Sequence, residues 1–120
     1  ARLSDKPRIV VIKGVPLIDD DGQKLSNVGF DKESGSFWRI DWDHIPVHYP
    51  GTGDIFTSVL TASLLKGESL PIALNRATTF TEIAVKTTYS YGTEPRLGVL
   101  FEDCLSWLMT NTVLSDYKKL

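Results

Sequence analysis

The residues best suited to chemistry are Gly51, Thr52, Gly53 and Asp54, which come just before a stretch with the apolar spacing of a helix. At the start of a helix, the first backbone N–H groups have no partner within the helix, and the helix dipole adds partial positive charge. Glycines let those N–H groups approach an anion closely. Asp54 would then stand beside a bound phosphoryl group, where it could accept the proton of an attacking hydroxyl. These four residues therefore predict a phosphoryl-transfer site.

Turn chemistry alone also explains this segment, because Gly-Thr-Gly favours a turn and an acidic residue stabilises a helix start. It is not a Walker A loop, since no Gly-Lys-Ser/Thr follows the glycines. A second signal upstream favours the phosphate site. Residues 9–12 are four consecutive β-branched residues, which predict a strand of a parallel sheet buried on both faces. Lys13 and Gly14 follow at its carboxyl end, where open α/β sheets bind their ligands.

The rest of the chain predicts a hairpin followed by helices. Residues 24–31 and 36–41 read as two strands around a turn at 32–35. A first helix is expected from Gly53 to Lys66, ending at Gly67, and a second after Ser69. A third is expected from about Leu97 to Met109. Because a solitary parallel strand cannot make a sheet, these elements indicate an α/β layer sandwich that is incomplete.

Several side chains are expected to be structural. Trp38 and Trp42 should pack in the core or at an interface, and Cys104 should be a buried small hydrophobe. His44 and His48 lack the partners of a catalytic triad or a metal site, so they are expected to be structural or solvent-facing. The second helix has an apolar stripe formed by Ala73, Ala77, Phe80 and Ala84.

Composition bounds the class of protein. The chain has 120 residues, of which 42% are hydrophobic and 23% charged, and we expect a single domain over residues 1–120. The formal net charge of −2 gives no general attraction to nucleic acid or to an anionic membrane. No apolar run is long enough to cross a bilayer, and the N-terminus lacks the charged-then-apolar order of a signal peptide. The single cysteine excludes an internal disulfide, so the sequence predicts a soluble cytoplasmic protein.

The segment Gly51–Phe56, the strand that leads to Lys13-Gly14 and the following helices resemble the C-terminal half of a pyridoxal kinase. These enzymes belong to the ribokinase-like superfamily. Its sugar kinases usually carry Gly-Ala-Gly-Asp here and its hydroxymethylpyrimidine kinases Gly-Thr-Gly-Cys, so Thr52 with Asp54 favours vitamin B6. The Lys-Gly pair is similar to the pyrimidine kinases. The resemblance runs from about Arg8 to Met109 and covers half of such a kinase, since these enzymes are more than twice this long.

The resemblance implies the C-terminal portion of a ribokinase-like three-layer sandwich. It implies transfer of the γ-phosphoryl group of ATP to the 5′-hydroxyl of pyridoxal, pyridoxine or pyridoxamine. Asp54 would be the catalytic base, and the N–H groups of Gly51, Thr52 and Gly53 would form the anion hole. Lys13 would contact the β- or γ-phosphate, with Mg²⁺ bridging phosphate oxygens. The adenine pocket would include residues 45–48, in particular Ile45 and Val47, and the third helix.

The expected partners are ATP and a B6 vitamer, without nucleic acid or membrane, and the full-length enzyme is expected to be a homodimer. The acceptor site and its lid would lie in the other half of such an enzyme. Two alternatives remain. One is another ribokinase-like kinase, acting on hydroxymethylpyrimidine or a sugar. The other is a nonenzymatic domain that binds a nucleotide or a partner.

Overall fold

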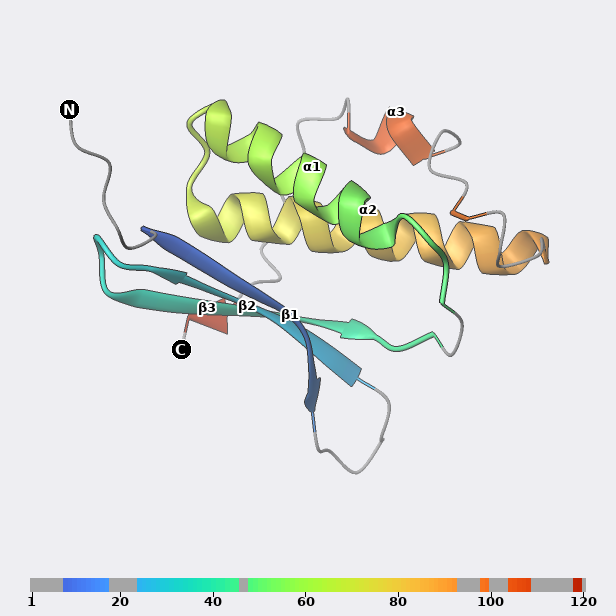
Figure 1. Ribbon diagram of the computed structural model, residues 1–120, viewed down its shortest axis with the longest axis horizontal. Coiled ribbons are helices and arrows are strands. Elements are labelled where there is room, and N and C mark those ends of the chain that lie inside the picture. Colours follow the sequence, from blue (N-terminus) through green and yellow to red (C-terminus); the bar gives the residue numbers. More distant parts are fainter. Residues whose placement is uncertain are drawn as a thin grey trace.

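A computed structural model describes residues 8–17, 24–45, 48–92, 98–99, 104–108 and 118–119. Its strands form one sheet in the order β1 (Ile9–Leu17), β2 (Lys24–Asp31), β3 (Ser36–Asp43) and β4 (Lys118–Lys119). The helices are α1 (Thr52–Leu65), α2 (Leu70–Tyr91) and α3 (Leu105–Leu108). Helices α1 and α2 cover one face of the sheet, and α3 lies beyond them, away from the sheet (Figure 1). The α/β class predicted from the sequence is therefore confirmed.

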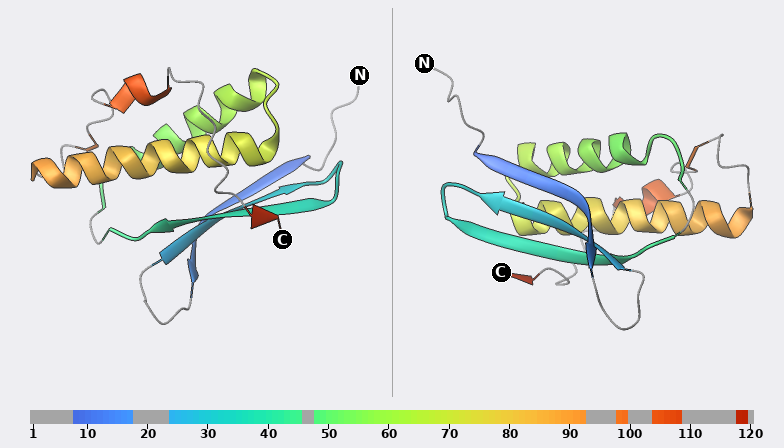
Figure 2. Two further views of the ribbon diagram at one scale, coloured as in Figure 1. Left: turned by 180° about the vertical axis from the view of Figure 1, so that it is seen from behind. Right: turned by 60° about the horizontal axis from the view of Figure 1, so that its bottom comes forward.

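Strand β1 differs from its prediction. It pairs antiparallel with β2 at the edge of the sheet, and no residue of it is fully buried, so a parallel strand buried on both faces was the wrong expectation. Val11 packs toward the helices, whereas Val10 and Ile12, on the opposite face, are 41% and 56% exposed. A run of β-branched residues indicates a strand, but it does not fix the direction of the neighbouring strand. Figure 2 (right) looks onto the sheet face that α1 and α2 leave uncovered.

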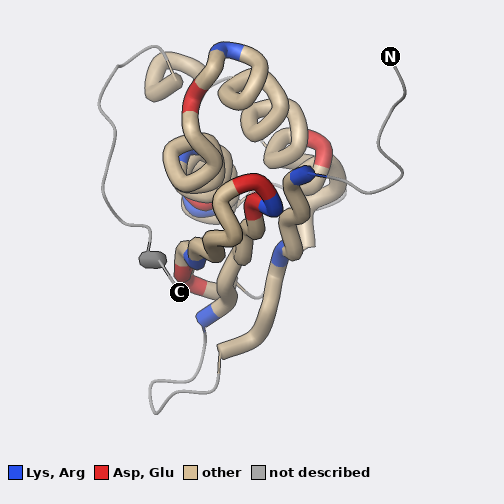
Figure 3. Tube along the Cα trace, turned by 90° about the vertical axis from the view of Figure 1, so that its left-hand side faces the viewer, with Lys and Arg blue, Asp and Glu red and all other residues tan. Residues whose placement is uncertain are grey.

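Strands β2 and β3 form the predicted hairpin, with continuous pairing from Lys24 opposite Asp43 to Asp31 opposite Ser36. Near its turn, Arg8 forms ion pairs with Asp31 and Glu33 at 3.6 and 3.0 Å. Charges of both signs therefore lie side by side at this end of the sheet (Figure 3).

The main core lies between the sheet and α2. The four residues predicted as the apolar stripe of this helix are all buried: Ala73, Ala77, Phe80 and Ala84. Gly29 on β2 permits close approach, because a Cβ there would lie 3.2 Å from Leu74 and 3.3 Å from Leu70. Ile40 of β3 forms one buried cluster with Leu74, Ala77 and Phe56, and Trp38 packs against this cluster as expected.

The helix ends follow their sequence signals. Helix α1 is followed by Gly67 at a φ of +91°, which is the predicted C-terminal glycine. Helix α2 starts after Ser69, although the Ser69 side chain makes no capping hydrogen bond, and it ends at Gly92 with a φ of +67°. None of the helices within the described residues combines the length and apolar character that crossing a bilayer requires.

The predicted start of the third helix is wrong. Its predicted ends at residues 97 and 109 lie outside the described residues. Gly98 and Val99 are not helical, and the φ of +83° at Gly98 departs from helical geometry. Cys104 is buried as predicted, in a second cluster with Phe80 and Ala84. The left-handed backbone at Gly98 is therefore incompatible with a helix that starts near residue 97, and the described helix α3 is the shorter segment Leu105–Leu108.

Candidate functional site

The start of α1 is shaped by Gly51. This residue has a φ of +92°, in the left-handed region that favours glycine, and Thr52 begins the helix. The N–H of Ile55 donates to the Gly51 carbonyl at 3.0 Å, which closes the first turn. The Thr52 hydroxyl donates to the carbonyl of the buried Tyr49, also at 3.0 Å. The helix N–H groups before Ile55 have no acceptor within the helix, so they remain able to bind an anion.

Lys13 reaches this helix start from the sheet. Pairing of β1 with β2 is interrupted by a bulge at Lys13 and Gly14, where Gly14 has a φ of +71°. A Cβ added to Gly53 would lie only 3.0 Å from Lys13 Nζ. The same ammonium lies 5.3 Å from the centroid of the Phe56 ring, within the range of a cation–π contact. The structure therefore brings Lys13 and Gly53 together, although they are far apart in sequence.

Two positive features meet at this point. The ammonium of Lys13 carries a full charge, and the N-terminus of α1 carries partial positive charge from the helix dipole. Like charges close together repel, and the Phe56 ring offsets only part of that repulsion. An anion between the ammonium and the helix N–H groups would interact favourably with both. The geometry is therefore that of a candidate anion site, in which Gly53, having no side chain, lets the Lys13 ammonium approach the start of α1 closely.

A cavity of about 590 Å³ adjoins this anion site. Lys13, Thr52, Gly53 and Ile45 all line it, whereas Val47 lies outside the described residues. The other contributors come mainly from β2, β3 and α2: Leu25, Asn27, Trp42, Thr78, Thr81, Glu82 and Val85. The cavity is large enough for a small organic ligand whose anionic end would reach Lys13.

Some of the lining was not predicted from the sequence. Trp42 was expected in the core or at an interface, but it lines this cavity and donates through its indole nitrogen to Asn27 at 3.3 Å. His44 and His48, expected to be structural or solvent-facing, are exposed and also line it. Their position in the sequence, between β3 and the glycine turn, could have indicated that they line the cavity, since the connection between these elements passes it.

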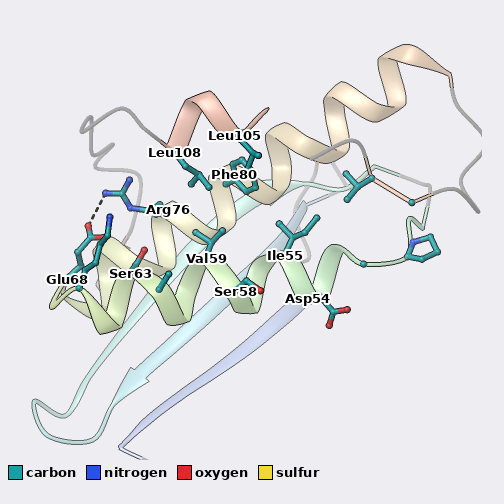
Figure 4. A pocket seen from close by; sticks show the side chains of 16 residues that line it. Asp54, Ile55, Ser58, Val59, Ser63, Glu68, Arg76, Phe80, Leu105 and Leu108 are labelled. Carbon is teal, nitrogen blue, oxygen red and sulfur yellow. Dashed lines mark hydrogen bonds and ion pairs between the residues drawn. The ribbon is translucent and has the colours of Figure 1, made fainter. Parts of the chain in front are cut away.

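Asp54 lies on a different side of the helix start. Its side chain is exposed, and with Gly51 it borders a second cavity of about 750 Å³ between α1, α2 and α3. In Figure 4 its carboxylate projects away from Phe80 and Leu105. Of the described α3 residues, Leu105 and Leu108 line this second cavity and none lines the Lys13 cavity, so α3 and Ile45, which were expected together in the adenine pocket, line different cavities. The first turn of α1 thus presents Thr52 and Gly53 to one cavity and Asp54 to another.

The end of β3 is fastened to α2 beside the Lys13 cavity. The N–H of Asp43 donates to Glu82 at 2.9 Å, and Lys86 pairs with Asp43 at 3.2 Å and with Glu82 at 3.6 Å. Partial burial alone would lower the pKa of Lys86, but the hydrogen bond to Asp43 and the charges of Glu82 and Asp43 outweigh it and raise the pKa above 10.5. Since the folded pKa is the higher one, this contribution to stability is complete at neutral pH and is lost only above that value. These contacts therefore hold the end of β3, from which the segment with His44 and Ile45 continues, against α2.

The fold and the site define a class. A sheet with helices packed on one face, the glycine turn at α1 and the lysine at the β1 bulge place the chain among the ribokinase-like α/β folds. The chain belongs to the phosphomethylpyrimidine kinase family, whose model matches residues 2–97. A comparison with curated proteins gave no match.

Solved structures agree with this family. A Bacteroides thetaiotaomicron protein assigned as a phosphomethylpyrimidine kinase and crystallised with pyridoxal is 38% identical, with a TM-score of 0.86 over 95% of this chain. Pyridoxal kinase from Lactobacillus plantarum is 28% identical, with a TM-score of 0.64 over 83% of it. Pyridoxal kinase from Leishmania donovani, solved with ADP and pyridoxamine, is 19% identical and shares the fold with a TM-score of 0.76 over 94%. This chain covers 40%, 36% and 39% of those three proteins, respectively.

Proposed function

We propose that this chain is the C-terminal catalytic part, residues 1–120, of an ATP-dependent kinase for vitamin B6. The reaction would transfer the γ-phosphoryl group of ATP to the 5′-hydroxyl of pyridoxal, pyridoxine or pyridoxamine. The convergence of Lys13 with the N-terminus of α1, next to an exposed Asp54, carries this proposal. The pyridoxal in the crystals of the Bacteroides relative supports a B6 acceptor. By resemblance, the complete enzyme would be a cytoplasmic homodimer.

ATP would occupy the Lys13 cavity. Its adenine would lie toward Ile45 and Val47, and its β- and γ-phosphates would lie between Lys13 and the N–H groups of Gly51–Asp54. The ADP in the Leishmania relative supports a nucleotide in this fold. Among the described residues, no three His, Cys, Asp or Glu side chains gather as a metal site. We therefore propose that Mg²⁺ is bound mainly through phosphate oxygens and water, as this ion commonly is.

Asp54 would receive the proton of the acceptor hydroxyl. It lies in the first turn of the helix whose N–H groups would hold the transferred phosphoryl group, so the hydroxyl and the phosphorus can meet at this turn. A carboxylate of ordinary basicity suffices, because the transition state of phosphoryl transfer is loose and positioning matters more than base strength. The residues that hold the vitamin would come from the remaining part of the protein.

A hydroxymethylpyrimidine kinase is the second candidate. The family match and the Lys13-Gly14 pair favour it, whereas Asp54 in place of the usual cysteine favours the B6 kinase. Both candidates use the same nucleotide site and differ only in the acceptor.

A substrate panel on the complete protein tests the proposal. With ATP and Mg²⁺, we expect kcat/KM for a B6 vitamer to exceed that for hydroxymethylpyrimidine or ribose by at least about tenfold, a difference of about 1.4 kcal/mol in transition-state binding. A higher value for hydroxymethylpyrimidine would establish the second candidate instead. Stabilisation by ATP without turnover of any acceptor would identify a nonenzymatic nucleotide-binding protein.

Lys13→Ala in the complete protein should impair nucleotide use selectively. Loss of a hydrogen bond from a charged donor costs about 1.5–3 kcal/mol, so kcat/KM for ATP should fall about 10- to 100-fold, with a lower kcat. The KM for the vitamer should change much less, because Lys13 lies in the nucleotide cavity. Steady-state kinetics with each substrate varied in turn would measure both effects.

Lys32→Ala provides the matched control, since Lys32 is an exposed lysine in the β2–β3 turn, remote from both cavities. Its kinetics should stay within about twofold of wild type. If Lys13→Ala weakened ATP and vitamer equally, Lys13 would have no specific phosphate role.

A further inference from the structure

Asn27 occupies a central position beneath the anion site. It lies on β2 and is 4% exposed. Its Oδ1 accepts the N–H of Gly14 at 3.1 Å and the indole N–H of Trp42 at 3.3 Å. Its Nδ2 donates to the hydroxyl of Thr78 on α2 at 2.9 Å. One buried amide therefore connects β1, β3 and α2 around the cavity that Lys13 lines.

The orientation of this amide is fixed by its partners. A backbone N–H and an indole N–H can only donate, so the oxygen of Asn27 must face Gly14 and Trp42. The nitrogen must then face Thr78, whose hydroxyl oxygen can accept. An apolar residue of similar size would fill the space, but it would leave the two N–H donors without this acceptor.

The bond to Gly14 acts at the bulge. Pairing of β1 with β2 is interrupted at Lys13 and Gly14, so the sheet ladder does not hold the backbone there. The Asn27 oxygen supplies an acceptor for the Gly14 N–H instead. Lys13, the preceding residue, depends on this bulge for the direction in which its ammonium reaches Gly53.

We propose that Asn27 is a positioning residue for the phosphate site. Its amide holds the Lys13–Gly14 bulge in the conformation that places the Lys13 ammonium at the N-terminus of α1. This inference rests on the proposed function, because it assigns Asn27 a role through a lysine that binds phosphate. Asn27 also lines the Lys13 cavity, but in this account its effect on phosphate binding passes through Lys13.

A double-mutant cycle tests this dependence in the complete protein. The variants are Asn27→Leu, Lys13→Ala and the double variant, and the measured quantities are the Kd for ATP and the KM for each substrate. We expect Asn27→Leu alone to weaken ATP about tenfold and to leave the KM of the acceptor within about twofold. In the Lys13→Ala background, the same substitution should change the Kd for ATP less than twofold, since residues that act through one another are not additive.

Asn75→Leu is the matched control. Asn75 is also a buried asparagine, on α2, and it accepts a hydrogen bond from Thr79 at 3.1 Å, but it lines neither cavity. The substitution should lower the melting temperature without changing the KM for ATP. An equal loss of ATP affinity in Asn75→Leu would reduce Asn27 to a structural role and overturn the proposal.

Thr78→Val keeps the test decisive if Asn27→Leu fails to fold. It leaves the Gly14 contact in place and removes only the acceptor of Asn27 Nδ2. We expect ATP binding to weaken two- to threefold with intact Lys13 and to remain unchanged with Lys13→Ala. Equal losses in both backgrounds, for either substitution, would overturn the positioning role while leaving the proposed function standing. Failure of the wild-type protein to bind ATP would overturn both.

Discussion

Replacing Asp54 with asparagine in the complete protein should lower kcat by about 10²–10⁴-fold, the usual contribution of a positioned general base. The Kd for ATP should change less than about threefold, because Asp54 does not line the Lys13 cavity and the backbone N–H groups of α1 are retained. The amide of asparagine matches the shape of the carboxylate but cannot accept the hydroxyl proton. Steady-state kinetics and equilibrium binding of ATP on the same preparation would measure the two quantities.

Glu33→Gln is the matched control for Asp54→Asn, because it also replaces a carboxylate by the corresponding amide. Glu33 is a carboxylate in the β2–β3 turn that is 70% exposed and pairs with Arg8 at the surface. Its removal should leave kcat within about twofold of wild type. If Asp54→Asn also turned over within a few-fold of wild type, Asp54 would be excluded as the base.

The isolated 120-residue chain should show no detectable phosphorylation of pyridoxal. The chain holds a candidate base and an anion site, but turnover also requires the acceptor to be held against the γ-phosphate, which can contribute roughly 7–11 kcal/mol to lowering the barrier. The chain covers only 38% of a relative that is 37% identical to it. A coupled assay for ADP release, with the complete protein as the positive reference, would measure the loss.

The same sample should self-associate. Strand β1 forms the edge of the sheet, and Val10, Ile12 and Phe37 are exposed. Such an edge with apolar neighbours favours pairing between chains. Restoring the rest of the protein should recover both solubility and turnover. Robust turnover by the isolated chain would instead show that the acceptor site lies within these residues.

Local sequence signals predicted much of the fold. The hairpin was predictable because alternating residues flank a Gly-containing turn, and the end of α1 and the start of α2 were predictable from Gly67 and Ser69. The buried stripe of α2 follows from helical spacing alone. These features depend on residues close together in sequence, which is why pattern reasoning reached them.

Structural features that depend on contacts between residues distant in sequence could not be predicted in the same way. The direction of the neighbour of β1 depends on which strand it meets, and the four β-branched residues are compatible with either direction. Likewise, Gly98 interrupts an otherwise helical pattern because of its backbone conformation, which side-chain spacing does not reveal.

The sequence predicted which residues could bind an anion, but it did not predict the hydrogen bonds that hold those residues in place. The lysine and the glycine turn were expected to form one anion site, and the structure places Lys13 beside Gly53. The network of Asn27 was not predicted, because it joins residues 13, 15 and 51 positions apart through side-chain amide and indole groups. The catalytic roles themselves remain proposals.

The division of the first α1 turn between two cavities has a stereochemical consequence. Thr52 and Gly53 face the cavity of Lys13, whereas Asp54 faces away from it. Under the proposed function, the leaving ADP and the incoming hydroxyl would therefore lie on opposite sides of the phosphorus atom. This geometry suits a single in-line displacement, which inverts the configuration at phosphorus and requires no phosphorylated side chain on the enzyme.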